Sequence, residues 1–367
     1  MGRARQQKTV VRISTPADVL GVVPHRVGFH PTESIVVICL HGPRRRDGLV
    51  MRLDLAPPAA DSAVAGDLAT KAAHVKATAV LLVCYTEVPS QGPDLPRRAL
   101  VDALLARLGE RDIEVLDALL VHAGRWWSYH CTDPACCPPE GTPVPAQLTE
   151  AAAHFAAESV VAGGAVLAGR DELAASIRPP RGPVLTVARA QALERAGRHV
   201  VDVVRTGGSE LLRAETVDLL RALVRRWADG SRELDVEEAA RVVLGLGFKD
   251  ARDEAATLLL EADPEVLLAL LTALARHADL PDAAPICTVL AWVAYAHGRG
   301  ALANVAIERA LAADPAYEMA RLLQDGLVRM ITPAAVRAVT RDVRRSLETT
   351  GPPARKPAGP SRPHEVS

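Results

Sequence analysis

The stretch Ala79-Val80-Leu81-Leu82-Val83-Cys84-Tyr85 is an uninterrupted apolar run of strand length. A strand that is buried on both faces has this pattern, which is typical of parallel strands covered by helices. Helical patterns flank the run at 63–77 and 96–108, and another strand pattern follows at 113–121. This alternation of strands and helices predicts parallel pairing through crossover helices.

A β-hairpin is predicted just before this segment. The apolar strand Ser34–His41 and the strand Leu49–Leu55 are joined by a loop whose tip, Arg44–Arg46, points to solvent. A last strand pattern lies at 125–130. The predicted fold class is therefore an α/β N-terminal domain with a mixed sheet, built from a hairpin plus a βαβαβ segment.

A helix is predicted between the N-terminus and the hairpin. In Ser14-Thr15-Pro16-Ala17-Asp18, Thr15 can cap the helix, Pro16 suits the first helical position and Asp18 completes a capping box. We expect this helix to end near Pro24 and a short β-branched strand at 9–13 to precede it.

The C-terminal half of the chain carries only helical patterns. They lie at 184–205, 209–228, 235–246, 250–262, 264–278, 285–297, 300–313, 316–329 and 333–347. The pairs Asp263-Pro264 and Asp314-Pro315 each predict a clean helix start, because Asp can cap and Pro suits the first turn. Short connections make antiparallel neighbours, so an all-α C-terminal domain with repeat-like helical hairpins is predicted.

Prolines set the predicted domain limits. Residues 178–183 contain three prolines, a glycine and no apolar aliphatic side chain, as expected for a connector. We predict an α/β domain at 8–178, a helical domain at 184–347 and a disordered Pro-rich tail at 350–367.

Composition is that of an ordinary globular protein. Of 367 residues, 49% are apolar and 24% charged, and 43 basic against 44 acidic residues leave a net charge of −1. Disorder of the whole chain is excluded, and no global field exists to attract nucleic acid or an anionic membrane. Because no run reaches the ~18 apolar residues of a membrane span and no signal peptide is recognisable, a cytoplasmic protein is expected.

Three cysteines in one proline-rich loop are the sharpest chemical signal. Cys131, Cys136 and Cys137 lie within seven residues, directly after His130. Thiolates and imidazole are zinc ligands and a structural zinc site needs four, so zinc is the candidate cofactor. Adjacent cysteines rarely both bind one ion, so Glu140 or Asp133 would have to assist.

Two other interpretations of this loop stay open. A disulfide between Cys131 and Cys136, with Cys137 as resolving thiol, would give a redox site. Alternatively, the three thiols stay reduced, as cytoplasmic cysteines mostly do, and only pack beneath the loop.

An aromatic group precedes the cysteines. Trp126, Trp127 and Tyr129 crowd into four positions of a chain with few aromatic residues. On a strand, Trp127 and Tyr129 share one face and Trp126 takes the other. The group fits either a core or a surface that recognises a ligand or partner.

A second candidate site lies before the first long strand. His30 and Glu33 could form an acid–base pair, and Asp54 ends a strand that could reach the same edge of the sheet. Against catalysis, the sequence has no phosphate-binding loop, no Gly-x-Gly-x-x-Gly after a strand, no Gly-x-Ser-x-Gly elbow and no His-Glu-x-x-His motif.

Several stretches together resemble one known family. They are Ser14–Asp18, Gly28–Val37, Arg125–Tyr129 leading to Cys131–Gly141, and Gly300–Ala306 leading to Asp314-Pro315. From roughly Val10 to Leu323 the chain is similar to the actinobacterial family called domain of unknown function 4192. The family has no established activity, so the resemblance implies a bacterial cytoplasm and one fixed architecture, but no catalytic residue.

The segment Leu290–Pro315 also resembles a degenerate tetratricopeptide-like helical hairpin. Ala303, Ile307 and Ala310 have the spacing of its second helix, and Pro315 ends the unit. A plain helical bundle fits as well, since a solenoid normally needs at least ~3 repeats. The hairpin nevertheless makes the helical domain the place where a protein or peptide partner is expected.

Two functions follow from these features. The first is a non-enzymatic module that binds a partner or senses a ligand. The second is a hydrolase or redox enzyme that uses the His30/Glu33 loop, Asp54 and the Cys131–Cys137 loop. Convergence of the two loops at one place in the fold would favour the enzyme.

Overall fold

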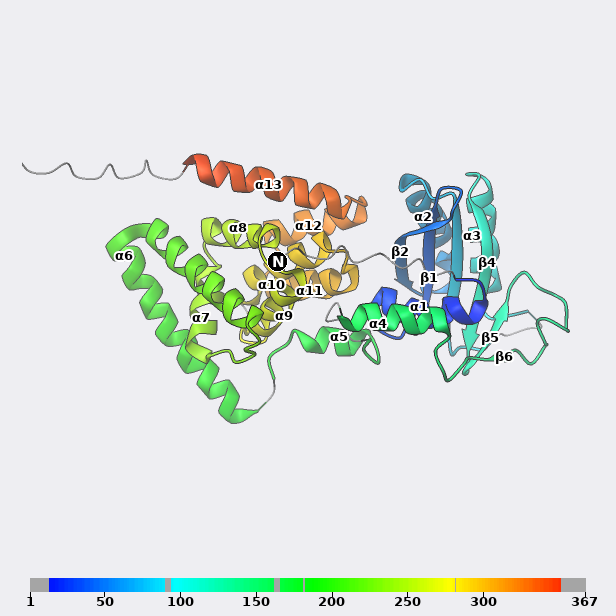
Figure 1. Cartoon of the computed structure of the whole chain (residues 1–367), viewed down its shortest axis with the longest axis horizontal. Coiled ribbons are helices and arrows are strands. Elements are labelled where there is room, and N and C mark those ends of the chain that lie inside the picture. The colour runs from blue at the N-terminus through cyan, green and yellow to red at the C-terminus, as the bar shows by residue number, and fades with distance from the viewer. Residues whose placement is uncertain (1–12, 90–93, 162–165, 181, 281, 351–367) are drawn as a thin grey trace, which may run out of the picture.

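A mixed β-sheet and a helical region follow each other along the chain (Figure 1). The computed structural model describes residues 13–89, 94–161, 166–180, 182–280 and 282–350. The strands are β1 (Ser34–His41), β2 (Arg46–Asp54), β3 (Ala79–Tyr85), β4 (Glu114–His122), β5 (Arg125–Ser128) and β6 (Thr142–Pro143). The predicted fold class, an α/β region with a mixed sheet followed by helices, is confirmed.

The strand β1 gives the sheet its mixed character. The order across the sheet is β2-β1-β3-β4-β5-β6. β1 pairs antiparallel with both β2 and β3, whereas β3 pairs parallel with β4. The strands β2, β3 and β4 therefore run in one direction, and the connection from β2 to β3 crosses over β1. β5 and β6 add two antiparallel strands at the far edge.

Helices cover both faces of the sheet. The side of Ile35 and Val37 packs against α2 (Asp61–His74) and α3 (Arg98–Gly109), which are joined to the strands by loops and the short helix η1 (Pro58–Ala60). The side of Val36 and Ile38 packs against α1 (Pro16–Val27), and α4 (Glu150–Val161) packs on α1. The alternation along β1 is the period of two that a strand imposes.

The start of α1 is as predicted, but its end is not. The Thr15 hydroxyl accepts the Asp18 N–H at 3.2 Å, and the Asp18 carboxylate accepts the Thr15 N–H at 2.9 Å, which completes the capping box. The helix continues through Pro24 to Val27, so the predicted end near Pro24 was wrong. Pro24 is buried against the core, and the left-handed Gly28 (φ 92°) closes the last turn by donating to the Pro24 carbonyl.

The helical region contains α5 (Arg170–Ser176), α6 (Pro183–Ala228), α7 (Val236–Gly245), α8 (Lys249–Thr257), η2 (Leu258–Leu260), α9 (Pro264–Ala275), α10 (Ala283–Ala296), α11 (Gly300–Ala313), α12 (Glu318–Val328) and α13 (Pro333–Thr350). α6 is broken at Gly208, whose φ of 72° and ψ of −174° are not helical. Its two arms fold back on each other, and His199 on the first pairs with Glu215 on the second at 2.8 Å. The two helices predicted on either side of residue 208 are therefore both present.

The two Asp-Pro pairs behave differently. The Asp263 carboxylate accepts the N–H groups of Glu265 and Val266, and Pro264 begins α9 as predicted. Asp314 ends α11 instead, and α12 begins only at Glu318, so the prediction of a helix start at Pro315 was wrong. The Asp314 carboxylate accepts the Ala316 N–H in a local turn, which competes with helix formation there.

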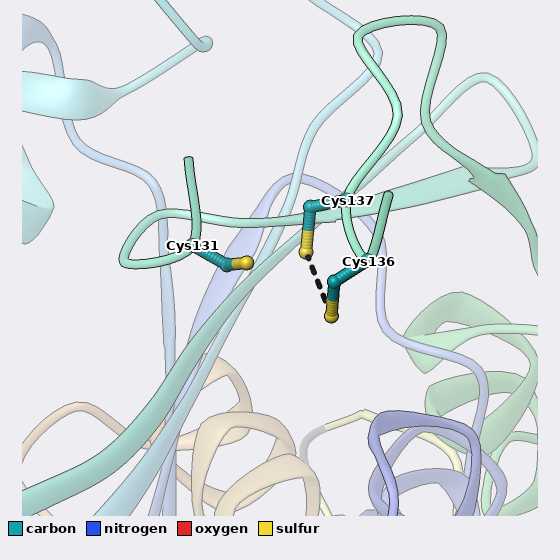
Figure 2. A group of neighbouring side chains, drawn as sticks. All are labelled: Cys131, Cys136 and Cys137. Atoms are coloured by element: carbon teal, nitrogen blue, oxygen red, sulfur yellow. Dashed lines mark hydrogen bonds between the residues drawn. The ribbon is translucent and has the colours of Figure 1, made fainter. Parts of the chain in front are cut away.

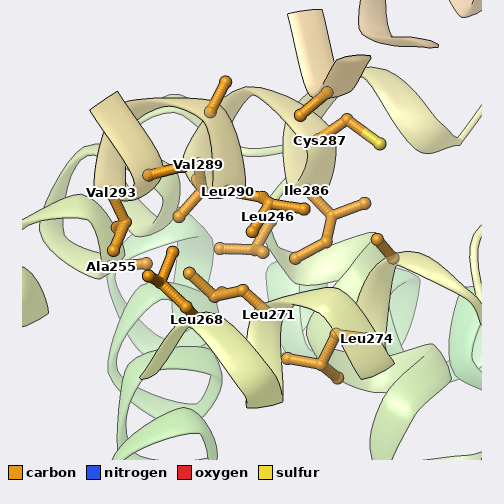
Figure 3. Close-up of a cluster of buried hydrophobic side chains, with 14 of the residues drawn as sticks. Leu246, Ala255, Leu268, Leu271, Leu274, Ile286, Cys287, Val289, Leu290 and Val293 are labelled. Atoms are coloured by element: carbon orange, nitrogen blue, oxygen red, sulfur yellow. The ribbon is translucent and has the colours of Figure 1, made fainter. Parts of the chain in front are cut away.

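The core of the helical region lies between α7, α9, α10 and α11 (Figure 3). Leu246 directly after α7, Leu271 on α9, and Ile286 and Leu290 on α10 are fully buried. α10 and α11 form the hairpin that the spacing of Ala303, Ile307 and Ala310 predicts, and these three side chains are buried in it. Small residues on α11 allow the close approach of its neighbour.

Arg309 on α11 ties three segments together. Its guanidinium donates to the carbonyl of Ala275 at 2.7 Å, to that of Ala278, and to that of Ile177 just after α5. Ile177 lies inside the predicted α/β domain, yet its side chain is fully buried in the helical core. The contact therefore links the end of α5 to the C-terminal end of α9.

Some sequence predictions concern residues outside the described ranges, and others are not tested by the structure. The strand at 9–13 lies, apart from Ile13, outside the described residues, as does the tail after Thr350. The domain limits 8–178 and 184–347 stay predictions, as does the tetratricopeptide-like character of the α10–α11 hairpin. Among the described residues, no helix combines the length and the apolar character needed to cross a membrane.

Candidate metal centre

The cysteine loop connects β5 to β6, and its first end is fixed by a buried serine. The Ser128 hydroxyl donates to the Asp117 carboxylate at 3.0 Å. The same oxygen accepts the N–H groups of His130 (3.2 Å) and Cys131 (3.3 Å). The backbone therefore turns away from the sheet directly after β5, in a geometry set by two side chains from neighbouring strands.

The second end of the loop is fixed by two side chains of β5. The Trp127 indole N–H donates to the Pro139 carbonyl at 3.0 Å. The Arg125 guanidinium donates to the carbonyls of Glu140 (2.6 Å) and Gly141 (2.7 Å). Three bonds thus hold residues 139–141 against the strand from which the loop started.

Gly141 is required at this position for two reasons. Its φ of 75° lies in the left-handed region, which disfavours other residues. A Cβ atom there would lie 2.3 Å from Cε2 of Trp127, far inside van der Waals contact. The glycine lets the backbone pass directly over the indole ring.

The middle of the loop is shaped by Asp133. Its carbonyl accepts the N–H groups of Cys136 (3.1 Å) and Cys137 (2.7 Å), and its carboxylate accepts the Ala135 N–H at 2.9 Å. This tight turn returns the chain so that Cys136 and Cys137 come back beside Cys131.

The three thiols converge on one point (Figure 2). The sulfur atoms of Cys131, Cys136 and Cys137 all lie within 4.8 Å of one another, and those of Cys136 and Cys137 are 3.9 Å apart. Cys136 is exposed and the other two are half-buried. Three sulfur donors at such distances could hold a metal ion.

Electrostatics distinguish the thiols. Hydrogen bonds from the Cys137 side chain and from the Asp133 backbone lower the pKa of the Cys131 thiol. Burial raises the pKa of the Cys137 thiol to about 12, and the neighbouring thiols act in the same direction. Cys131 therefore ionises before Cys137, and a metal ion would have to displace the proton from Cys137.

Other residues proposed for this site lie outside the sulfur cluster. His130 is exposed, and its imidazole is not part of the group of donors within 4.8 Å. The Asp133 carboxylate is occupied by the Ala135 N–H. Within the described ranges, no histidine or carboxylate joins the three thiols.

The aromatic group serves mainly as support for the loop. Trp127 and Tyr129 pack on the side of α2 and α3, and Trp126 on the side of α1, as their alternation predicts. Tyr129 is buried, and its hydroxyl donates to the Pro96 carbonyl at 2.6 Å. The two tryptophans are half-buried, and their use as a binding surface stays a prediction.

In the second candidate site, Glu33 and Asp54 bind different partners, and a catalytic site with His30 stays a prediction. The Glu33 carboxylate accepts the Thr86 hydroxyl (3.0 Å) and the Glu87 N–H, and Asp54 pairs with Arg52 at 2.6 Å. The His30 side chain is exposed. In the part of the chain that the structure describes, no hydrogen bond joins His30, Glu33 or Asp54 to one another or to the thiols.

Sequence reasoning located the thiols but missed the side chains that position them. Asp117, Ser128 and Arg125 carry no motif that marks them, because their partners are fixed only by strand pairing and by the path of the loop. Gly141 did have a signal, since a glycine after Pro138-Pro139-Glu140 is typical of a tight turn.

Fold and site together define a mixed α/β protein with a C-terminal helical region and a surface cluster of three thiols. The family model for the domain of unknown function (DUF4192) matches residues 16–334, and the chain belongs to this family. The predicted resemblance is confirmed over nearly the predicted range. Comparisons with curated proteins and with solved structures find no match to the chain.

Proposed function

We propose that the protein is a non-enzymatic, cytoplasmic ligand-sensing module in which the β5–β6 loop binds a zinc ion. One observation carries the proposal: three sulfur atoms lie within 4.8 Å of one another on a loop held at both ends. A loop with this shape loses little conformational entropy when it binds a metal. Metal binding would in turn stabilise the loop, because the site does not exist in an unfolded chain.

The enzyme alternative has less support. Acid–base chemistry needs its groups within hydrogen-bond reach of one another or of a shared substrate. His30, Glu33 and Asp54 instead have separate surroundings: an exposed imidazole, a carboxylate bound to Thr86, and an exposed carboxylate paired with the largely buried Arg52. The thiol loop, in contrast, brings its three candidate residues together.

Metal analysis of the purified chain tests the proposal. We expect about one zinc ion per chain, as three or four ligands on one loop would bind. Cys136→Ser should weaken zinc binding by at least about 100-fold, because it removes one of three thiolates. Cys287→Ser is the matched control: it removes a thiol buried in the helical core and should leave the zinc content unchanged.

A further variant examines His130, the fourth metal ligand predicted from the sequence. His130→Ala should retain the zinc, since its imidazole lies outside the sulfur cluster. A metal-free protein would overturn the proposal. If that protein formed a reversible Cys131–Cys136 disulfide, the function would be redox chemistry instead.

We further propose that the helical region binds a protein or peptide partner along the first arm of α6. Val184, Val187 and Val201 on this arm are 79%, 55% and 64% exposed. Several exposed apolar side chains on one helix are typical of a surface that a partner covers.

A paired substitution tests this surface. Val184→Ser with Val187→Ser should leave the melting temperature nearly unchanged, because both side chains are exposed. Quantitative cross-linking to proteins of the native host should identify partners whose yield falls about tenfold in this variant. Gln191→Ser, an exposed polar position on the same arm, is the control. Equal cross-linking by all three proteins would place the partner surface elsewhere.

A further inference from the structure

We infer that the metal ion of the β5–β6 loop keeps one coordination position open, and that this position takes a small external thiol as thiolate. The inference rests on the proposed zinc site and names the ligand that the site senses. Its first support is the number of donors. Zinc binds four ligands in a closed structural site, whereas three protein ligands leave a position for an exchangeable group. Across the described ranges, the cluster supplies three sulfur atoms and no fourth side chain.

The loop is held in a shape that keeps the fourth position free. The backbone N–H of His130 is bound to the Ser128 hydroxyl, and its exposed imidazole lies outside the group of donors. The Asp133 carboxylate holds the turn through Ala135. Glu140 is fixed through its carbonyl by Arg125, and its side chain is exposed. None of these three side chains belongs to the group of donors that lie within 4.8 Å of one another.

Exposure distinguishes this cluster from the other cysteines. Cys39, Cys84 and Cys287 are fully buried, as structural thiols usually are. Cys136 is exposed, and the three sulfur atoms meet at the surface of the loop (Figure 2). A molecule from solvent can reach a metal ion bound there.

Chemistry and charge select a thiol. A metal held by three thiolates prefers another soft donor over an oxygen ligand. The added ligand brings a negative charge, and the Arg125 guanidinium lies at the base of the loop, where it donates to the Glu140 carbonyl at 2.6 Å. On binding, the thiol would transfer its proton to the water molecule at the fourth position, the zinc–oxygen bond would break as that water leaves as a hydronium ion, and a zinc–sulfur bond would form. No oxidant or reductant takes part.

Cobalt spectroscopy tests the inference on the full chain. Co²⁺ replaces zinc in thiolate sites, and its ligand-field bands report the donor set. We expect one Co²⁺ per chain, and titration with 2-mercaptoethanol should shift the bands reversibly to a single new spectrum. Ethylene glycol, in which a hydroxyl replaces the thiol, should bind at least about tenfold more weakly. Glu140→Gln and His130→Ala should give the same titration as the unmodified chain.

The outcomes separate this inference from the proposed function. Failure to bind Co²⁺ or zinc overturns the metal site itself. A chain that binds Co²⁺ but whose bands do not respond to 2-mercaptoethanol has a closed site, and only the open position is overturned. Two other results also overturn the open position. In the first, 2-mercaptoethanol removes the metal from the protein, and the metal then passes an ultrafiltration membrane. In the second, sedimentation shows one metal ion shared by two chains, because the second chain then supplies the fourth donor.

Discussion

Replacing Arg309 with alanine lowers the free energy of unfolding by about 3–5 kcal/mol. The guanidinium donates to three carbonyl groups that end α5 and α9, so its removal leaves several partly buried acceptors without a donor. Each such loss costs about 1–3 kcal/mol, and bonds to a charged donor lie at the upper end of this range. The expected fall in melting temperature is about 10 °C, which differential scanning calorimetry measures directly.

An exposed arginine supplies the control for this substitution. The Arg345 side chain on α13 is 75% exposed and pairs with Asp342, one turn earlier. Arg345→Ala should change the stability by less than about 0.5 kcal/mol, as is usual for surface pairs. If the two alanine variants had the same melting temperature, the hydrogen bonds of Arg309 between α5, α9 and α11 would not stabilise the fold.

Gly141→Ala is expected to lower stability by about 3 kcal/mol and to reduce the zinc content of the chain. The left-handed backbone costs a non-glycine residue about 1–2 kcal/mol, and the clash with the Trp127 ring adds about as much. The new methyl group must displace either the indole or residues 139–141, and both hold the thiol loop. Thermal unfolding, tryptophan fluorescence and zinc analysis give three independent readouts.

Gly124, which directly precedes β5, is a matched control for Gly141. Its φ of 72° nearly equals that of Gly141, but a Cβ atom there would meet nothing within 4 Å. Gly124→Ala should therefore show the backbone cost alone, about 1–2 kcal/mol, and keep its zinc. Equal losses in the two variants would show that Trp127 can move aside freely.

Local patterns predicted most elements of the fold. The limits of β1 and β3 were predicted to the residue, because each is an apolar run bounded by polar or turn residues. The start of α1 was predicted because a capping box is a local arrangement of four residues. The insertion of β1 between β2 and β3 was not predicted, since neighbouring strands in a sheet are chosen by packing over long sequence distances.

In the candidate site, too, contacts between residues close in the sequence were predicted and contacts between distant residues were not. The sequence alone showed that Cys131, Cys136 and Cys137 lie near one another, because seven residues cannot place them far apart. It could not show that Glu33 turns to Thr86, 53 residues away, instead of to His30. Arg309 was also missed, because its partner Ile177 lies 132 residues earlier in the chain.

The short strand β6 also determines how the sheet ends. Val144 donates its N–H inward to the Gly124 carbonyl at 3.0 Å, so the backbone nitrogen of the preceding Pro143 points outward. A proline nitrogen carries no hydrogen, and a second chain that approached this edge would find no donor there. At the opposite edge, β2 presents the exposed charged residues Arg46 and Asp54. Both edges are thus protected against edge-to-edge aggregation, which lets the thiol loop stand at the border of the sheet without recruiting another strand.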